Sequence, residues 1–177
     1  MDDIVLAALK KWPKVPHCVG WLALDARGDW YLRDDAARAA GPFPRVKGSR
    51  VVHDKLRRFI GRNYATDADG QWYFQNGPQR VYVELEAAPW VWRLQAQGDA
   101  PPRVESHTGL PASPLAEGGV WLDESGRLFL ATDLGFGLVH TLDMLDAAAA
   151  IECGHWAPAA LPFAAMPGHF GYRLRPG

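Results

Sequence analysis

A cluster of amide and guanidinium side chains at one strand reversal is the strongest candidate for a ligand site. It consists of Gln75, Asn76, Gln79 and Arg80. An arginine can bind a carboxylate or phosphate through two parallel hydrogen bonds, and loops hold a disproportionate share of functional side chains. Turn chemistry accounts for Asn76 and the glycine after it, but it does not require the other three. We therefore expect these four residues to contact an anionic ligand.

Two histidines extend this candidate ligand set. His53 and His140 each follow a valine and precede a predicted helix. If the chain contains an internal duplication, the two residues are equivalent and could face each other, and such a pair could titrate near neutral pH. The alternative, which we prefer, is that each satisfies hydrogen bonds at the start of its helix or in the core.

Two pairs of soft ligands raise the question of a metal. They are His17-Cys18 and Cys153-Gly-His155. Adjacent residues of an extended chain point to opposite faces, so His17 and Cys18 are poorly placed to share one ion, and no Cys-x-x-Cys pair is present. We expect neither a metal nor another cofactor. Cys153 with His155 or His140 has the residue types of a cysteine nucleophile, but an inert thiol is the preferred interpretation.

A basic segment covers residues 45–62. Its basic residues are Arg45, Lys47, Arg50, Lys55, Arg57, Arg58 and Arg62, against the single acid Asp54. Such a segment could contact a nucleic-acid backbone, although a solvated helix face is the commoner explanation. The later helix carries Asp143, Asp146 and Glu152 instead. Helices of opposite charge could mediate self-association, so a homo-oligomer or a protein partner is expected before nucleic acid.

Composition excludes several classes of protein. A net charge of -1 over 177 residues gives no global attraction to nucleic acid or to an anionic membrane. Two cysteines provide no disulfide framework, and no apolar run is long enough to span a bilayer. The N-terminus is acidic before it is basic, the wrong order for a secretory signal. We expect a cytoplasmic protein whose eight tryptophans mainly fill the core, with an aromatic platform for a flat ligand as the alternative.

The predicted elements are organised around a strand pair at 70–86 that turns at Asn76-Gly77. Aromatic and β-branched residues fill both arms. The periodicity of apolar residues predicts helices over 2–12 and 54–62. Two strands flank the turn that starts at Asp25, and a further strand follows at 89–94. Residues 34–48 and 96–118 are rich in turn-forming residues. The first is expected to be a loop, and the second a linker or long loop in which a brief strand at Arg103–His107 is the alternative.

The order of these elements occurs twice. Aligning Asp25 with Asp123 and His53 with His140 gives the same succession of hairpin, Val-His, helix, Gly-x-Trp and strand. The final strands of the two copies are expected at 81–85 and 170–174. We predict an α+β, β-rich fold made of two similar ββαβ-like halves after an N-terminal helix. Unrelated segments that obey the same turn rules are the alternative. The expected divisions are 1–19, 20–95, a linker at 96–118, and 119–177, packed as one unit.

Three runs of this sequence resemble a proteobacterial family of uncharacterised proteins, a domain of unknown function. They are Gly20–Asp25, Phe59–Tyr64 and Gly70–Val81. The resemblance covers most of the chain. It implies a bacterial protein, and it provides no activity and no catalytic residues.

The side chains do not form an acid–base or nucleophile set by their spacing, and neither Gly-x-Ser-x-Gly nor His-Glu-x-x-His occurs. We therefore expect a non-catalytic binding or interaction module. The first alternative is a small enzyme or sensor that binds an anionic molecule between the two halves. The second is nucleic-acid contact through residues 45–62. A flat or apolar binding face would favour the module, and a deep polar pocket would favour the enzyme.

Overall fold

Two mixed β-sheets with short helices make up the fold, in a computed structural model that describes residues 1–116 and 118–177. Backbone contacts divide the chain into two compact units. Unit 1 comprises Met1–Asp25, Asp29–Glu86 and Gly171–Gly177, and unit 2 comprises Ala26–Gly28 and Ala87–Phe170. The predicted α+β, strand-rich class with an N-terminal helix is confirmed.

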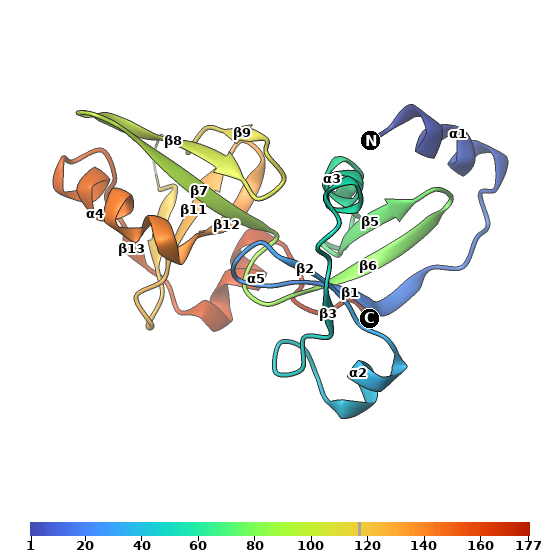
Figure 1. The fold of residues 1–177 in the computed structure, drawn as a ribbon. Helices are drawn as coiled ribbons and strands as arrows, with labels where there is room; N and C mark the ends of the chain where they lie inside the picture. Colours follow the sequence, from blue (N-terminus) through green and yellow to red (C-terminus); the bar gives the residue numbers. More distant parts are fainter. Residues whose placement is uncertain (117) are drawn as a thin grey trace. The chain divides into compact units, whose positions relative to one another are not determined.

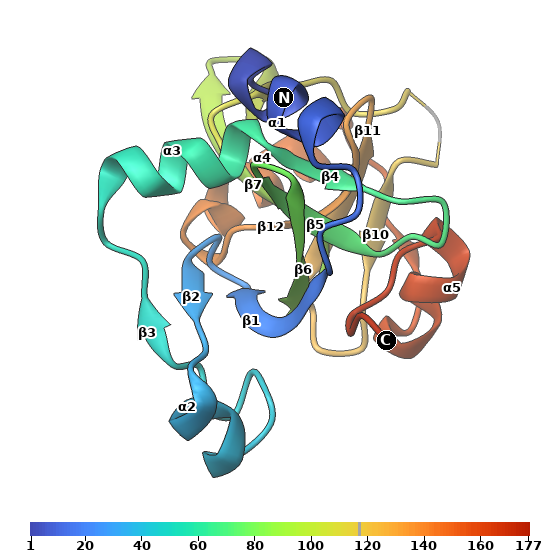
Figure 2. The same cartoon turned by 90° about the vertical axis from the view of Figure 1, so that its right-hand side faces the viewer.

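Unit 1 contains a six-stranded sheet and three helices. The strands run in the order β3-β2-β1-β6-β5-β4, with β1 and β6 parallel at the centre. Helix α3 packs on β5 (Figures 1 and 2). The bounds are α1 (Asp3–Lys11), β1 (Cys18–Leu24), β2 (Trp30–Leu32), α2 (Asp35–Ala40), β3 (Ser49–Arg50), α3 (Asp54–Arg62), β4 (Tyr64–Thr66), β5 (Trp72–Asn76) and β6 (Gln79–Leu85).

Unit 2 contains a seven-stranded sheet in the order β13-β10-β11-β12-β7-β8-β9, with β12 and β7 parallel. Helix α4 packs on β7 and β8 through Ala147 and Ala150, which are buried. The bounds are β7 (Trp90–Gln97), β8 (Ala100–Ser106), β9 (Pro111–Ala112), β10 (Val120–Leu122), β11 (Leu128–Thr132), β12 (Gly135–Val139), η1 (Thr141–Asp143), α4 (Met144–Glu152), β13 (Ala159–Ala160), η2 (Phe163–Ala165) and α5 (Met166–Phe170).

The two sheets repeat one topology. In unit 1 the meander β4-β5-β6 joins β1 through its last strand, and in unit 2 the meander β10-β11-β12 joins β7 in the same way. The pairing registers also agree. Phe74 pairs with Tyr64 and Val81. Leu130, 56 residues after Phe74, pairs with Val120 and Gly137, which lie 56 residues after Tyr64 and Val81. The repeat is therefore gapless over residues 64–82 and 120–138.

This register corrects the alignment predicted from the sequence. Asp123 corresponds to Asp67 rather than to Asp25, and His140 corresponds to Glu84 rather than to His53. Residues 96–118 are not a linker, because all of β8 and β9 lies there. Residues 34–48, predicted to be a loop, contain α2. The sequence pattern missed the offset of the repeat because strand pairing is a long-range property.

Three hairpins share one type of turn between their strands. In the turns that begin at Asp25, Asp67 and Asp123, the first residue donates its N–H to the carbonyl four residues later, at 3.0 to 3.1 Å. The Oδ1 of the same aspartate accepts the N–H of that later residue at 2.8 to 3.0 Å. This double contact explains why aspartate begins each turn, and it confirms the turn chemistry predicted at Asp25.

The C-terminal segment belongs to unit 1. Leu174 accepts a hydrogen bond from Leu85 at 2.8 Å, and Arg173 donates one to the carbonyl of Gly70 at 3.0 Å. The sequence predicted that Phe170–Leu174 would form the last strand of the second half. Instead α5 ends at Phe170, and the following residues extend the contacts of the first sheet.

Candidate functional site

One face of the unit 1 sheet carries an apolar row. Strand pairing places Cys18, Val81 and Phe74 beside one another on β1, β6 and β5, and it places Leu22 beside Leu32 on β1 and β2. Residues that pair across neighbouring strands project to the same side of a sheet. These five side chains therefore form one surface.

Helix α3 covers only part of this row. Its Phe59 ring packs edge-on against Phe74 with centroids 5.4 Å apart, and its Ile60 is fully buried. Leu56, one turn before Ile60, remains 36% exposed. The helix therefore closes one side of the row and leaves a groove beside it.

The groove has a volume of about 260 Å³ and a mostly apolar lining. Besides the five residues of the row, the lining includes Trp21 and Asn76 from the strands and Leu56 and Ile60 from α3. Trp21 and Leu32 are 41% and 48% exposed. Large apolar side chains that gather in this way on a protein surface usually mark a binding site. This groove is therefore the best candidate site in unit 1.

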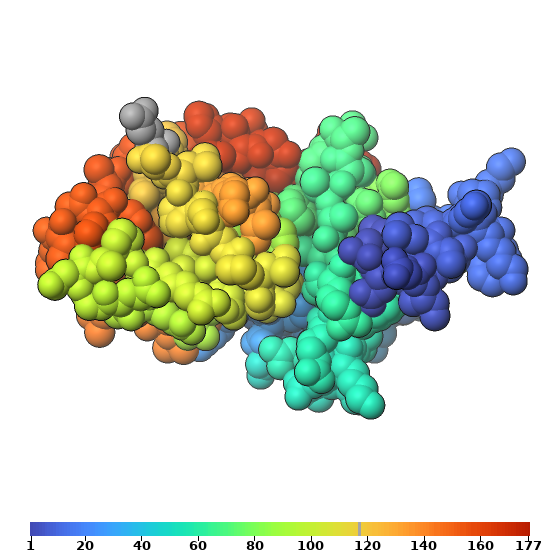
Figure 3. All heavy atoms as spheres, turned by 90° about the horizontal axis from the view of Figure 1, so that it is seen from above, coloured from blue at the N-terminus to red at the C-terminus, as the bar shows by residue number. Residues whose placement is uncertain are grey.

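Basic side chains border the groove. The guanidinium of Arg38 lies 5.6 Å from the centroid of the Trp21 ring. Lys55 and Arg57 flank Leu56 on α3, and all three basic residues are exposed. Figure 3 shows the outer face of α3, in teal, open to solvent. Arg38 and Arg57 contact Asp35 and Asp54 only at 3.4 Å and at exposed positions, where such pairs contribute little.

The four predicted residues of the hairpin do not converge on one site. Gln75 is buried, and its Nε2 donates to the carbonyl of Gly77 at 2.9 Å. Gln79 donates to the carbonyl of Pro16 at 3.0 Å. The Arg80 guanidinium lies 4.5 Å from the centroid of the Tyr73 ring. Asn76 alone of the four lines the groove.

The two histidines have different environments. His53 precedes α3, is exposed, and makes no capping hydrogen bond with its side chain. His140 is buried, and its Nδ1 accepts the N–H of Leu142 at 3.1 Å. This contact is the hydrogen bond at the start of a helix that the preferred interpretation of His140 predicts. Ligand binding by either residue remains a prediction.

Much of the basic segment 45–62 is held by carboxylates. Lys47 contacts Asp25 at 2.8 Å and Glu86 at 3.2 Å. Arg50 pairs with Asp29 at 2.8 Å, and Arg62 pairs with Asp2 at 3.0 Å. Nucleic-acid contact through this segment remains a prediction, but these three cations already have acidic partners.

Comparison with known proteins identifies the family. A family model named DUF2944, described as "Protein of unknown function (DUF2946)", matches residues 1–176. The chain belongs to this family. The resemblance to an uncharacterised family is thereby confirmed. No curated protein matches the chain.

Two solved structures are similar to this family member. One is a DUF1285 family protein from Shewanella baltica, with 15% identity and a TM-score of 0.49, covering 72% of this chain and 90% of that one. The other is a DUF1285 family protein from Silicibacter pomeroyi, with 14% identity and a TM-score of 0.49, covering 83% of each chain.

Buried and partly buried ion pairs fix the opposite side of the unit 1 sheet in this family member. Arg33 is 3% exposed and donates from Nη1 to Glu84 at 2.9 Å and from Nη2 to the carbonyl of Gly41 at 2.6 Å. Partial burial lowers the pKa of Lys47, but its contacts with Asp25 and Glu86 outweigh this and raise the pKa above its ordinary value. These pairs hold the α2 loop on the sheet.

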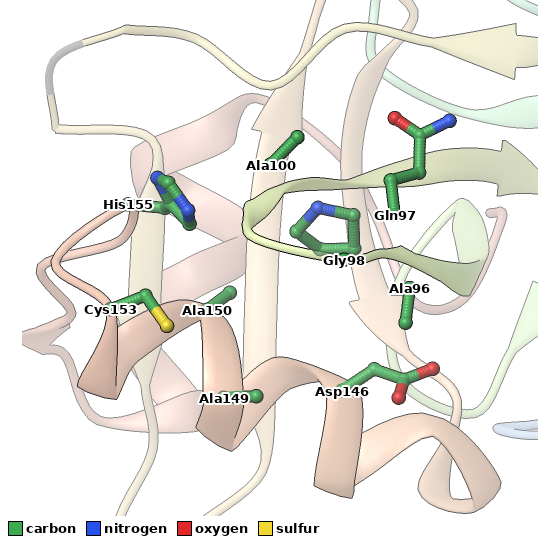
Figure 4. A pocket seen from close by; sticks show the side chains of 10 residues that line it. Ala96, Gln97, Gly98, Ala100, Asp146, Ala149, Ala150, Cys153 and His155 are labelled. Carbon is green, nitrogen blue, oxygen red and sulfur yellow. The ribbon is translucent and has the colours of Figure 1, made fainter.

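Cys153 and His155, the cysteine and histidine considered above as a possible nucleophile and base, line a small cavity in unit 2. The cavity has a volume of about 40 Å³, and its lining includes Cys153, His155 and Asp146. This volume admits water but no organic substrate. The His155 ring contacts the carbonyl of Asp99 at 2.8 Å. In Figure 4 the Cys153 sulfur points along α4 toward Ala150 and away from the His155 imidazole, so these two residues do not form a nucleophile–base pair.

Two further features, a cluster that could hold a metal ion and a helix that could cross a membrane, are absent from the described residues. Within 1–116 and 118–177, no group of three or more His, Cys, Asp or Glu side chains could hold a metal ion. Over the same residues, no helix combines the length and apolar character that crossing a bilayer requires.

Sequence reasoning missed the groove because its residues come from four strands and a helix. Trp21, Leu32 and Leu56 belong to separate predicted elements, and each has a pattern that suggests core. Their partial exposure follows from the position of α3 on the sheet. Alternation of apolar and polar residues around Trp21 does not show which face of β1 this side chain occupies, because the register of β1 shifts between Cys18 and Leu22.

Proposed function

We propose that this member of the DUF2946 family is a non-catalytic interaction module. Its binding site is the groove of unit 1, and its ligand is an amphipathic protein segment that carries aliphatic side chains beside acidic ones. The observation that carries the proposal is the exposed trio Trp21, Leu32 and Leu56 around an apolar groove of about 260 Å³.

The apolar lining favours binding over catalysis. Ligand sites of enzymes combine an apolar pocket with a few converging polar groups. Here Asn76 and Cys18 are the polar residues of the lining, which includes no carboxylate, imidazole or amine. An amphipathic helix in a groove is a recurring mode of peptide recognition, in which residues spaced by three, four and seven positions provide the anchors.

The charges around the groove favour an acidic partner. Helix α3 carries Lys55, Arg57, Arg58 and Arg62 against one acid, Asp54, and Arg38 lies over the Trp21 ring. Complementary charge steers association and discriminates against partners of the wrong sign. A basic amphipathic segment would meet repulsion at the same apolar surface.

The location proposed with this function is the cytoplasm. Cys18 and Cys153 are both free thiols, a state that reducing compartments maintain.

Two synthetic peptides test the function. Both place leucines at positions 1, 4 and 8 of a helix; one carries only acidic residues on its polar face and the other only basic ones. Methyl NMR spectra of the intact chain are recorded during titration with each peptide. We expect the acidic peptide to shift the methyl signals of Leu22, Leu32, Leu56, Ile60 and Val81, and the basic peptide to bind at least tenfold more weakly.

Matched variants locate the site. Leu56→Glu should abolish binding of the acidic peptide, because it puts a carboxylate into the groove. Leu110→Glu is the control, since Leu110 is 45% exposed in unit 2 and outside the groove. If neither peptide moves the groove methyl signals, or if Leu110→Glu weakens binding as much as Leu56→Glu, the proposed function is wrong.

A further inference from the structure

Helix α4 has the features that the groove requires of its ligand. Leu142 and Leu145 are 67% and 85% exposed, the latter the highest value among the large apolar side chains that are exposed. Leu142 lies in η1, directly before α4, and Leu145 lies in the first turn of α4. Both leucines are therefore open to solvent at the start of the helix, whereas Ala147 and Ala150 attach the helix to the unit 2 sheet.

The charge of α4 is also complementary to the groove. The helix contains Asp146 and Glu152 and no lysine or arginine. Asp143, before it, is not available to a partner because it accepts two hydrogen bonds from Arg93, at 2.6 and 3.0 Å, and one from Leu94 at 3.0 Å. That ion pair fixes the start of α4 on β7, so the two leucines are presented on a rigid element.

We propose that the occupant of the groove is α4 of a second copy of this chain, which rests on the function proposed above. Leu142 and Leu145 enter the apolar groove beside Trp21 and Leu56. Glu152 of the entering helix, which is exposed, faces the basic residues that border the groove. The contact joins two different surfaces, so two such contacts close a symmetric dimer, and a contact that does not close builds longer assemblies.

The other exposed helix fits less well. Helix α1 exposes Ile4 at 75% and Leu6 at 49%, but its last turn is basic, with Lys10 and Lys11. Asp3 is the single acid of α1, and Asp2, before it, already accepts a hydrogen bond from Arg62 within unit 1 at 3.0 Å. A second copy of α1 would therefore bring positive charge to a positive border.

Complementation between two variants tests the inference. Sedimentation velocity of the full chain, at concentrations up to about 100 µM, saturates a contact with a micromolar dissociation constant. We expect the wild-type chain to self-associate, and Leu56→Glu and Leu145→Glu each to remain monomeric. A mixture of the two variants should form a one-to-one heterodimer, because one variant retains α4 and the other retains the groove.

Controls separate this contact from other modes of association. Leu32→Glu provides a second groove variant if Leu56→Glu does not fold, as judged by its circular dichroism melt. Ile4→Glu in α1 and Leu110→Glu should self-associate as the wild type does. A monomeric wild-type chain, or a mixture that stays monomeric, overturns the inference. The proposed function stands independently if the acidic peptide still binds the groove of that monomer, and both are wrong if it does not.

Discussion

Asp67 and Asp123 occupy the same position in two hairpins, 56 residues apart. In both turns the aspartate Oδ1 accepts the backbone N–H groups of the residues two and four positions later, at 2.8 to 3.0 Å. Asp67 also accepts the hydroxyl of Tyr82 at 3.0 Å, whereas Asp123 accepts Nε of Arg127 at 2.6 Å. The backbone contacts are thus repeated, and the side-chain partners differ.

Removing either aspartate should destabilise its own sheet. Asp67→Ala and Asp123→Ala each leave two backbone N–H groups without their acceptor, and we expect losses of about 1–3 kcal/mol in the free energy of unfolding. Asp69→Ala is the control in the same turn, because Asp69 is exposed, and it should change stability by less than about 0.5 kcal/mol. Urea denaturation measures all three. Equal effects at positions 67 and 69 would contradict the assigned role of Asp67.

Two glycines in these turns should differ in their tolerance of alanine. Gly70 and Gly126 both have φ of +75°, but a Cβ at Gly70 would overlap the carbonyl of Gly171, whereas one at Gly126 meets open space. Gly126→Ala should lose about 1–2 kcal/mol, from the left-handed backbone alone. Gly70→Ala should lose more.

Hydrogen exchange in the C-terminal segment distinguishes the two glycine variants. Hydrogen exchange at Arg173, whose N–H bonds to Gly70, should speed up in Gly70→Ala and stay unchanged in Gly126→Ala. Similar denaturation midpoints for the two variants would argue against the close approach of residue 171.

The buried pair Arg33–Glu84 should be sensitive to the loss of one partner. Glu84→Gln leaves the guanidinium of Arg33, 3% exposed, without its counter-charge, and we expect a loss of about 3–5 kcal/mol. Glu105→Gln is the control in an exposed pair, where Arg103 lies 3.8 Å away, and it should cost less than about 1 kcal/mol. The double variant Arg33→Met, Glu84→Leu should be more stable than Glu84→Gln alone. Thermal and urea unfolding test this order.

Acid should weaken the anchor of α4. Burial raises the pKa of Asp143, but the hydrogen bonds from Arg93 and Leu94 outweigh it, so the pKa lies below its ordinary value. A depressed pKa contributes stability that is fully present above the unfolded-state value of about 3.9 and is lost as pH falls through the folded-state pKa.

The pH dependence of unfolding tests this sign. Asp143→Asn should lower stability at pH 7 and flatten the decline below about pH 4. Glu152→Gln, at an exposed position of α4, should leave that decline in place. An unchanged acid limb in Asp143→Asn would show that the Arg93 contact does not contribute to it.

The local elements of this protein follow from its sequence. The helix predicted at 54–62 is observed with those bounds, and the strand pair around Asn76-Gly77 forms as expected. These features depend on neighbours within a few residues: apolar spacing defines the face of α3, and glycine permits the reversal at Gly77. The family resemblance also came from the sequence, because it depends on short runs of residues.

The tertiary structure decided the partners of each strand and therefore the site. A period of two fixes which residues of a strand share a face, but it does not say that Cys18 lies beside Val81 or that β7 lies beside β12. These pairings place Trp21, Leu32 and Leu56 around one groove and set the 56-residue offset of the repeat. They join segments far apart in the chain, so their free energy depends on the packing of the whole unit rather than on any local pattern.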